Sequence, residues 1–246
     1  MNAGQFLEPD PSFLKWPFPV AVTRHKVVQA SNHLLRFLLL LDHFDSPVRY
    51  SFLVRQIQIG QQPLIADRPS LGWWVSELAK SLKGEADLRQ VVSIADREKV
   101  VHLRNERRGH GWMSVNDETY RDDSARLETV LSRIEEELEP FLLSHQLVIP
   151  RELKVSSGGY EVSGDHLAGS HLLHPLFSRR LQSDPVACGI AGQDEVYVTD
   201  GQMREFKLMS PHIRAAVCPE CRHPRILITD GGRQYIDVFV GHRVEL

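Results

Sequence analysis

The spacing of apolar residues changes near Pro150, and this change divides the chain into a part with helical spacing and a part with the pattern of β-hairpins. Before it, apolar residues recur at steps of three and four, which is the spacing of an amphipathic helix. The clearest set is Tyr120, Leu127, Val130, Leu131, Ile134, Leu138, Phe141 and Leu142. After Pro150, Gly-Gly or Asp-Gly pairs separate runs of β-branched and aromatic residues in "LKVSSGGYEV", "VYVTDGQMREFKLM" and "ILITDGGRQYIDVFV". Such pairs are typical of β-hairpins.

This division predicts an α+β protein in which an all-helical bundle precedes a small antiparallel β domain. We expect a proline-rich, extended N-terminal arm over residues 1–21, a helical domain over 22–149 and a β-rich domain over 150–246. Within the helical domain, helices are expected at 22–45, 47–59, 70–83 and 86–108, followed by the long amphipathic helix that ends near Leu147.

Composition limits the classes of function. The chain has 246 residues and a formal net charge of −3, so it has no global basic field, and any contact with nucleic acid must be local. The N-terminus lacks a basic segment followed by an apolar one, and the apolar run 34–41 is too short to cross a membrane. Three cysteines are too few for a disulfide framework. We therefore expect a cytoplasmic protein without a membrane segment.

One segment, "VVHLRNERRGHGW", concentrates cationic and hydrogen-bonding side chains at the end of a helix. Arg104 follows Val100 by four residues, so it continues the apolar stripe of its helix, and a guanidinium in such a place needs a partner, an interface or a ligand. Gly109 and Gly111 release the backbone from helical geometry and let His110 turn back towards the arginines.

These residue types suit chemistry on a phosphodiester. A histidine can take or give the proton of a ribose hydroxyl, and an arginine can hold the negative charge that develops on phosphorus. A simpler explanation uses the same residues: basic side chains complement the negative end of a helix dipole, and glycine ends the helix. The residue types alone favour this simpler explanation.

The segment "LRNERRGHG" between two long helices resembles the signature of the HEPN superfamily, an all-helical fold. Its motif is an arginine, a polar residue that is often asparagine, and a histidine four to six residues after the arginine. Here Arg104, Asn105 and His110 fill these places. The preceding "PSLGWWVSELAKSLK" also resembles bacterial members, and the resemblance covers about 22–147.

The resemblance implies a metal-independent endoribonuclease of a bacterial toxin or antiviral defence effector, in which the ribose 2′-hydroxyl attacks the adjacent phosphorus. Arg104, Asn105 and His110 would be catalytic, and Arg107 and Arg108 would hold the RNA. The enzyme would work as a homodimer through the helical domain, without a metal or other cofactor, and an antitoxin or defence protein could be its partner. The alternative is a non-catalytic HEPN-like dimerisation or adaptor module that binds a protein or nucleotide. Arg104 would then only satisfy a buried polar network.

The C-terminal half resembles a module of bacterial multidomain proteins that carries a CxxC, a hairpin and a terminal Gly-His, for which partner contact or sensing is the expected role. Cys218 and Cys221 could be half of a zinc site, since two thiolates at this spacing can share one metal. The sequence contains no second CxxC, so the other ligands would come from His212, His223, His242 or Cys188. A turn without metal is favoured, and zinc stays an open alternative.

Two further sets of residues are expected to be structural. Glu135, Glu136 and Glu137 are expected on the solvated face of the last helix. Trp73 and Trp74 are expected in the core or in a dimer contact, because they lie beside apolar residues at helical spacing.

Overall fold

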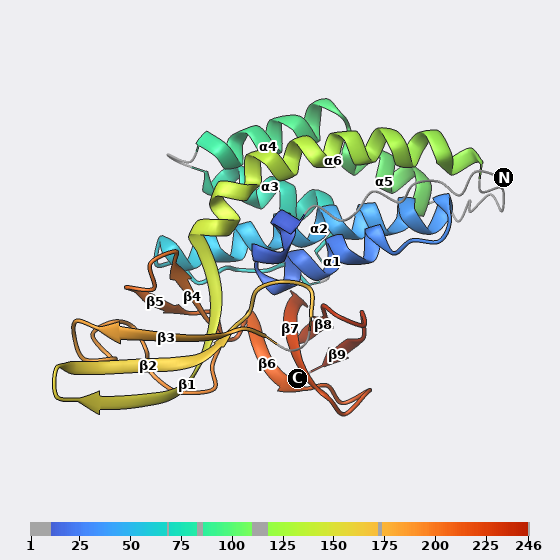
Figure 1. Ribbon diagram of the computed structural model, residues 1–246. Coiled ribbons are helices and arrows are strands. Elements are labelled where there is room, and N and C mark those ends of the chain that lie inside the picture. The colour runs from blue at the N-terminus through green and yellow to red at the C-terminus, as the bar shows by residue number, and fades with distance from the viewer. Residues whose placement is uncertain (1–10, 68, 83–85, 110–117, 172–173, 246) are drawn as a thin grey trace.

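The structure is a computed structural model that describes residues 11–67, 69–82, 86–109, 118–171 and 174–245. Figure 1 shows the helices gathered on one side of the molecule and two antiparallel sheets on the other. The helical elements are η1 (Pro11–Lys15), α1 (Phe18–Val28), α2 (His33–Gln58), α3 (Leu71–Ser81), α4 (Ala86–Arg97), α5 (Val100–Gly109) and α6 (Thr119–Ser144). The predicted α+β class, with the helical part first, is confirmed.

The first sheet has the strand order β3-β2-β1-β4-β5, and the second has the order β6-β7-β8-β9. The strands of the first sheet are β1 (His145–Ser156), β2 (Gly159–His166), β3 (Leu176–Leu181), β4 (Tyr197–Asp200) and β5 (Phe206–Leu208). Those of the second are β6 (Ile213–Val217), β7 (Pro224–Gly231), β8 (Gln234–Asp237) and β9 (Arg243–Glu245). The three predicted hairpins are the pairs β1–β2, β4–β5 and β7–β8.

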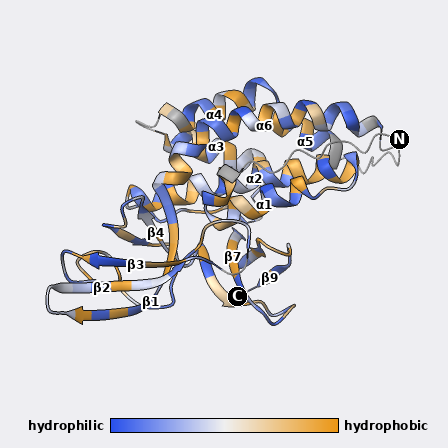
Figure 2. Ribbon diagram, in the orientation of Figure 1, coloured by the Kyte–Doolittle hydropathy of each residue, from blue (hydrophilic) through white to orange (hydrophobic). Residues whose placement is uncertain are grey.

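One apolar core joins the helices to both sheets. Strand alternation divides the side chains of β1: Leu147 and Ile149 enter this main core, whereas Val148 packs into a smaller cluster on the opposite face of the first sheet. The second sheet does the same, with Ile226 and Ile228 in the main core and Leu227 in a separate cluster. In Figure 2, hydrophobic and hydrophilic stretches alternate along α6 and β1. None of the helices among the described residues has the length and hydropathy to span a membrane.

Two polar side chains of the helical layer reach the second sheet. Arg49 of α2 is buried, and its Nη1 donates to the Thr229 carbonyl oxygen at 2.9 Å and to Asp230 Oδ1 at 3.0 Å. Lys26 of α1 donates to the Val238 carbonyl oxygen at 3.0 Å. The helices and the second sheet are therefore packed as one body rather than joined only by the chain.

Several helix boundaries differ from the expected ones, and the last helix ends at Ser144 rather than near Leu147, which lies in β1. The expected helices 22–45 and 47–59 are wrong: α1 ends at Val28, and α2 continues through Pro47 because Phe44 and Val48 on either side pack into the core. Asn32 begins α2 by accepting a hydrogen bond from the Leu35 backbone N–H at 2.8 Å.

The expected helix 86–108 is also wrong as a single element. Lys99 has a φ of 55°, in the left-handed region, so the helix is interrupted between the end of α4 at Arg97 and the start of α5 at Val100. In the expected N-terminal arm, residues 1–10 lie outside the described residues. Pro11–Lys15 is helical, and α1 begins at Phe18 rather than at residue 22.

Candidate functional site at the end of α5

The motif helix α5 buries one end of its apolar stripe and exposes the other. Val100 is 1% exposed, Val101 and Leu103 are half-buried, and Asn105 is exposed. Arg104 is half-buried, although its position on the stripe predicted an inward-facing side chain. The helix therefore leaves the core between Val100 and Glu106, which is exposed.

Among the described residues, the Arg104 guanidinium has one weak hydrogen-bond contact and no ion pair. Its Nη1 lies 3.5 Å from Asn105 Oδ1, at the outer limit of a hydrogen bond, and this contact is exposed. Within the part of the chain that the structure describes, no acidic side chain forms an ion pair with Arg104, whereas the nearby His102 pairs with Glu106 at 3.0 Å. Since Arg104 has no acidic partner among the described residues, its guanidinium is suited to binding an external anion.

The other predicted site residues are only partly placed. His110 lies outside the described residues, so the structure does not place it relative to Arg104. Arg107 and Arg108 belong to α5, but their side chains are also outside what the structure describes. Of the predicted catalytic set, the structure thus brings together Arg104 and Asn105.

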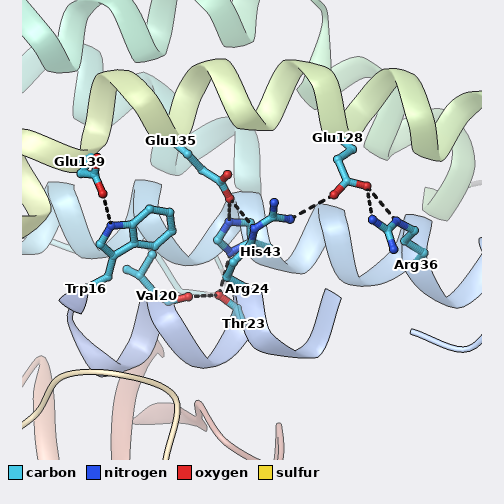
Figure 3. A network of polar contacts seen from close by, with 9 residues as sticks. All are labelled: Trp16, Val20, Thr23, Arg24, Arg36, His43, Glu128, Glu135 and Glu139. Atoms are coloured by element: carbon cyan, nitrogen blue, oxygen red, sulfur yellow. Dashed lines mark hydrogen bonds and ion pairs between the residues drawn. The ribbon is translucent and has the colours of Figure 1, made fainter. Parts of the chain in front are cut away.

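A separate network of polar side chains lies between α1, α2 and α6, as Figure 3 shows. His43 is 1% exposed and connects Thr23 Oγ1, 3.0 Å from its Nδ1, to Glu135 Oε1, 2.7 Å from its Nε2. Arg24 lies between Glu135 and Glu128, at 3.1 Å and 3.4 Å. The expectation of a solvated face is therefore wrong for Glu135, whose side chain is 14% exposed.

This network has the residue order of a nucleophile, a base and an acid, but its geometry is structural. The Thr23 hydroxyl is 2.8 Å from the Val20 carbonyl oxygen of its own helix, the usual contact of a threonine inside a helix. His43 is enclosed, so a substrate has no access to its ring. The network holds three helices together and is not a catalytic centre.

A groove of about 610 Å³ lies between the ends of α2 and α3, and it is lined by residues that include Phe52, Arg55, Leu64 and Lys80. In Figure 1 these helix ends lie at the opposite end of the helical layer from the end of α5. The groove is thus separate from the Arg104 region. Trp74, expected in the core or in a dimer contact, is fully buried in the core.

The second sheet contains a group of possible metal ligands. Ligand atoms of Cys218, Cys221, Asp237 and His242 all lie within 4.8 Å of one another. From the sequence, four residues were candidates for the remaining zinc ligands. Of these, His242 belongs to the group, whereas His212, His223 and Cys188 do not. Asp237 was missed, because its proximity to the cysteines depends on the pairing of β7 with β8.

Comparison with known proteins adds no assignment: no family model, no curated protein sequence and no solved structure matches the chain.

Proposed function

We propose that the chain is a metal-independent endoribonuclease of the HEPN type that cleaves RNA by attack of a ribose 2′-hydroxyl on the adjacent phosphorus. The observation that carries the proposal is the Arg104 guanidinium. It stands at the surface end of a helix, beside the Asn105 amide and without an acidic partner among the described residues. The buried network that the non-catalytic alternative requires around Arg104 does not fit its half-buried position.

In this proposal each motif residue has a distinct role. Arg104 binds the phosphate and holds the charge that develops on its oxygens, and Asn105 orients the guanidinium or the phosphate by hydrogen bonding. His110 transfers a proton at the 2′-hydroxyl or at the leaving 5′-oxygen. Arg107 and Arg108 bind neighbouring phosphates of the RNA. The products are a 2′,3′-cyclic phosphate and a 5′-hydroxyl, and DNA is not cut because it lacks the nucleophile.

A homodimer would complete the site, because one protomer offers a single Arg104–His110 pair and cleavage needs proton transfer on both sides of phosphorus. Most apolar residues of α3 are not available for this contact, since Leu71, Trp74, Val75 and Leu78 are buried within the chain. We therefore place the proposed dimer contact at the end of α5. The proposed setting is the cytoplasm, where an antitoxin or defence protein would control a toxin of this kind.

The test is cleavage of a fluorescent single-stranded RNA by the full chain in the presence of EDTA. Wild type should cut it, whereas Arg104→Ala and His110→Ala should each lower the rate at least about 100-fold, in the range found for lost acid–base and charge-stabilising groups. His102→Ala and Arg97→Ala change the same residue types nearby and should cut like wild type. Light scattering should give the mass of two chains for all five proteins.

Cleavage that requires added magnesium or manganese, or that survives in His110→Ala, would contradict the mechanism. A dimer that binds but does not cut RNA would point instead to the adaptor alternative. A monomer that cuts RNA would contradict the composite site and would leave Arg107 or Arg108 to act within one chain.

A further inference from the structure

Two turns at the same end of the second sheet bring four ligand-type side chains together. The turn between β6 and β7 carries Cys218 and Cys221. Asp237 is the last residue of β8, and His242 directly precedes β9. Because β6-β7-β8-β9 is an antiparallel sheet with neighbours in chain order, the β6–β7 and β8–β9 connections lie at the same end of the sheet. The grouping therefore follows from the sheet topology.

The distances fit a single small ion. All four ligand atoms lie within 4.8 Å of one another, and Cys218 Sγ is 3.6 Å from His242 Nδ1. In a tetrahedral zinc site, bond lengths of about 2.3 Å to sulfur and about 2.0–2.1 Å to nitrogen place these two atoms about 3.6 Å apart. The sulfur and the imidazole nitrogen are thus already at the separation that a shared zinc ion requires.

Backbone hydrogen bonds fix both turns in this arrangement. In the first, the Cys218 N–H donates to the His223 carbonyl oxygen at 2.9 Å, and the Arg222 N–H donates to the Cys218 carbonyl oxygen at 2.8 Å. Arg222 takes a left-handed conformation, with a φ of 57°, to make this turn. In the second, the Asp237 N–H donates to the His242 carbonyl oxygen at 2.8 Å.

Two of the four ligand residues are buried, and one carboxylate oxygen among them can take a cation as its partner. Cys218 and Asp237 are both 0% exposed. Asp237 Oδ1 accepts hydrogen bonds from the Phe239 and Val240 backbone N–H groups at 2.8 Å and 3.2 Å. Its Oδ2 lies 3.1 Å from Arg225 Nε, but the N–H bond is not directed at it, so this buried oxygen accepts no hydrogen bond from the described residues.

Charge balance agrees with the same conclusion. Metal binding deprotonates both thiols, so two thiolates and one carboxylate would carry three negative charges around the ion, and two of the three groups, Cys218 and Asp237, are buried. Arg225 supplies one positive charge, with its side chain 10% exposed. A divalent cation supplies the remaining two. Thiolate and imidazole ligands select zinc over magnesium or calcium, which prefer oxygen.

We propose that Cys218, Cys221, Asp237 and His242 bind one structural zinc ion, with Arg225 as the neighbouring positive charge. Four protein ligands close the coordination sphere, which is typical of a structural and not a catalytic zinc site. The ion would fasten the two turns of the sheet to each other. This site is separate from the proposed RNA-cleaving residues, so its test does not depend on cleavage.

The experiment measures metal content of the full chain, expressed with zinc and freed of loosely bound metal by gel filtration. Wild type should hold one zinc per chain by elemental analysis. Cys221→Ser and His242→Ala should lose most of it. Cys188→Ser and His223→Ala are matched controls, because neither residue belongs to the ligand group, and both should keep one zinc per chain.

A second measurement does not depend on the variants folding. Cobalt(II) added to metal-free wild type should give one equivalent of tetrahedral, thiolate-ligated spectrum, which zinc then displaces. Zinc well below one per chain in wild type, equal loss from ligand and control variants, or a cobalt spectrum without thiolate bands would each overturn the proposal.

Discussion

At the scale of single residues, His43 shows how the bundle accommodates polar groups in its interior. The imidazole is 1% exposed and both ring nitrogens have partners, Thr23 Oγ1 at 3.0 Å and Glu135 Oε1 at 2.7 Å. A buried polar group costs little when its hydrogen bonds are made and much more when they are not. The position of His43 therefore depends on residues from two other helices.

Replacing His43 by leucine should lower the free energy of unfolding by about 1–3 kcal/mol, because Glu135 and Thr23 would lose a buried partner. The measurement is urea denaturation followed by circular dichroism. His102→Leu is the matched control: His102 is exposed and its pair with Glu106 is at the surface, so the change should stay within about 1 kcal/mol. Equal effects of the two substitutions would contradict a structural role for the network.

At the scale of elements, the end of α6 is held by a side chain from the strand that follows it. Gln146 Nε2 donates to the Leu142 carbonyl oxygen at 2.7 Å, one of the carbonyls that a helix end leaves without an internal partner. Its Oε1 lies 3.0 Å from His166 Nε2 on β2, which acts as the donor. The helix end, β1 and β2 are thus joined by two consecutive hydrogen bonds.

This junction predicts a dependence on pH. Burial lowers the pKa of His166 from its ordinary value of 6.5. Just below pH 6.5 the unfolded chain is protonated at this histidine while the folded chain is not, so unfolding takes up a proton. The contribution of His166 to stability is therefore complete above pH 6.5 and decreases as the pH falls below it. His166→Gln removes this titration, so the variant should lose less stability than wild type between pH 7.5 and pH 5.5 in urea denaturation. A loss equal to that of wild type would refute the assignment.

The same scale explains which elements could be predicted from sequence. The hairpins of β1–β2, β4–β5 and β7–β8 were predictable because their signal, glycine between β-branched runs, is local. The continuation of α2 through Pro47 was not, because core packing on both sides of the proline decides it. The ligand group was half predictable for the same reason: Cys218 and Cys221 are close in sequence, whereas Asp237 joins them only through strand pairing.

At the scale of the whole molecule, Arg49 joins the helical layer to the second sheet. It is buried, it forms ion pairs with Asp45 on its own helix at 2.6 Å and with Asp230 at 3.0 Å, and its guanidinium lies 5.0 Å from the centre of the Trp74 ring. The residue therefore links α2, α3 and β7. Removing the Arg49 side chain would leave the Asp45 and Asp230 carboxylates without this positively charged partner.

Arg49→Met should lower the free energy of unfolding by about 3–5 kcal/mol, the range for breaking a buried ion pair from one side. Arg233→Met, an exposed arginine in the turn between β7 and β8, should change it by less than about 0.5 kcal/mol. Urea denaturation monitored by tryptophan fluorescence and by circular dichroism gives both values. The two probes should shift together in Arg49→Met if helices and sheet unfold as one unit. If the two probes gave different unfolding midpoints already in wild type, the helices and the sheet would not unfold as one unit.

The direct passage from α6 into β1 has a mechanical consequence. The helix ends at Ser144 and the strand begins at His145, so no hinge residue separates them. The helix has 26 residues and a length of about 39 Å at 1.5 Å per residue, and Pro140 removes one of its backbone hydrogen bonds near its last turn. Its first turn follows the motif segment in the chain, and its last turn is clamped to the first sheet. A tilt of the last turn of α6 is thus passed to β1 without an intervening loop, and Pro140 is the position at which the helix bends most easily.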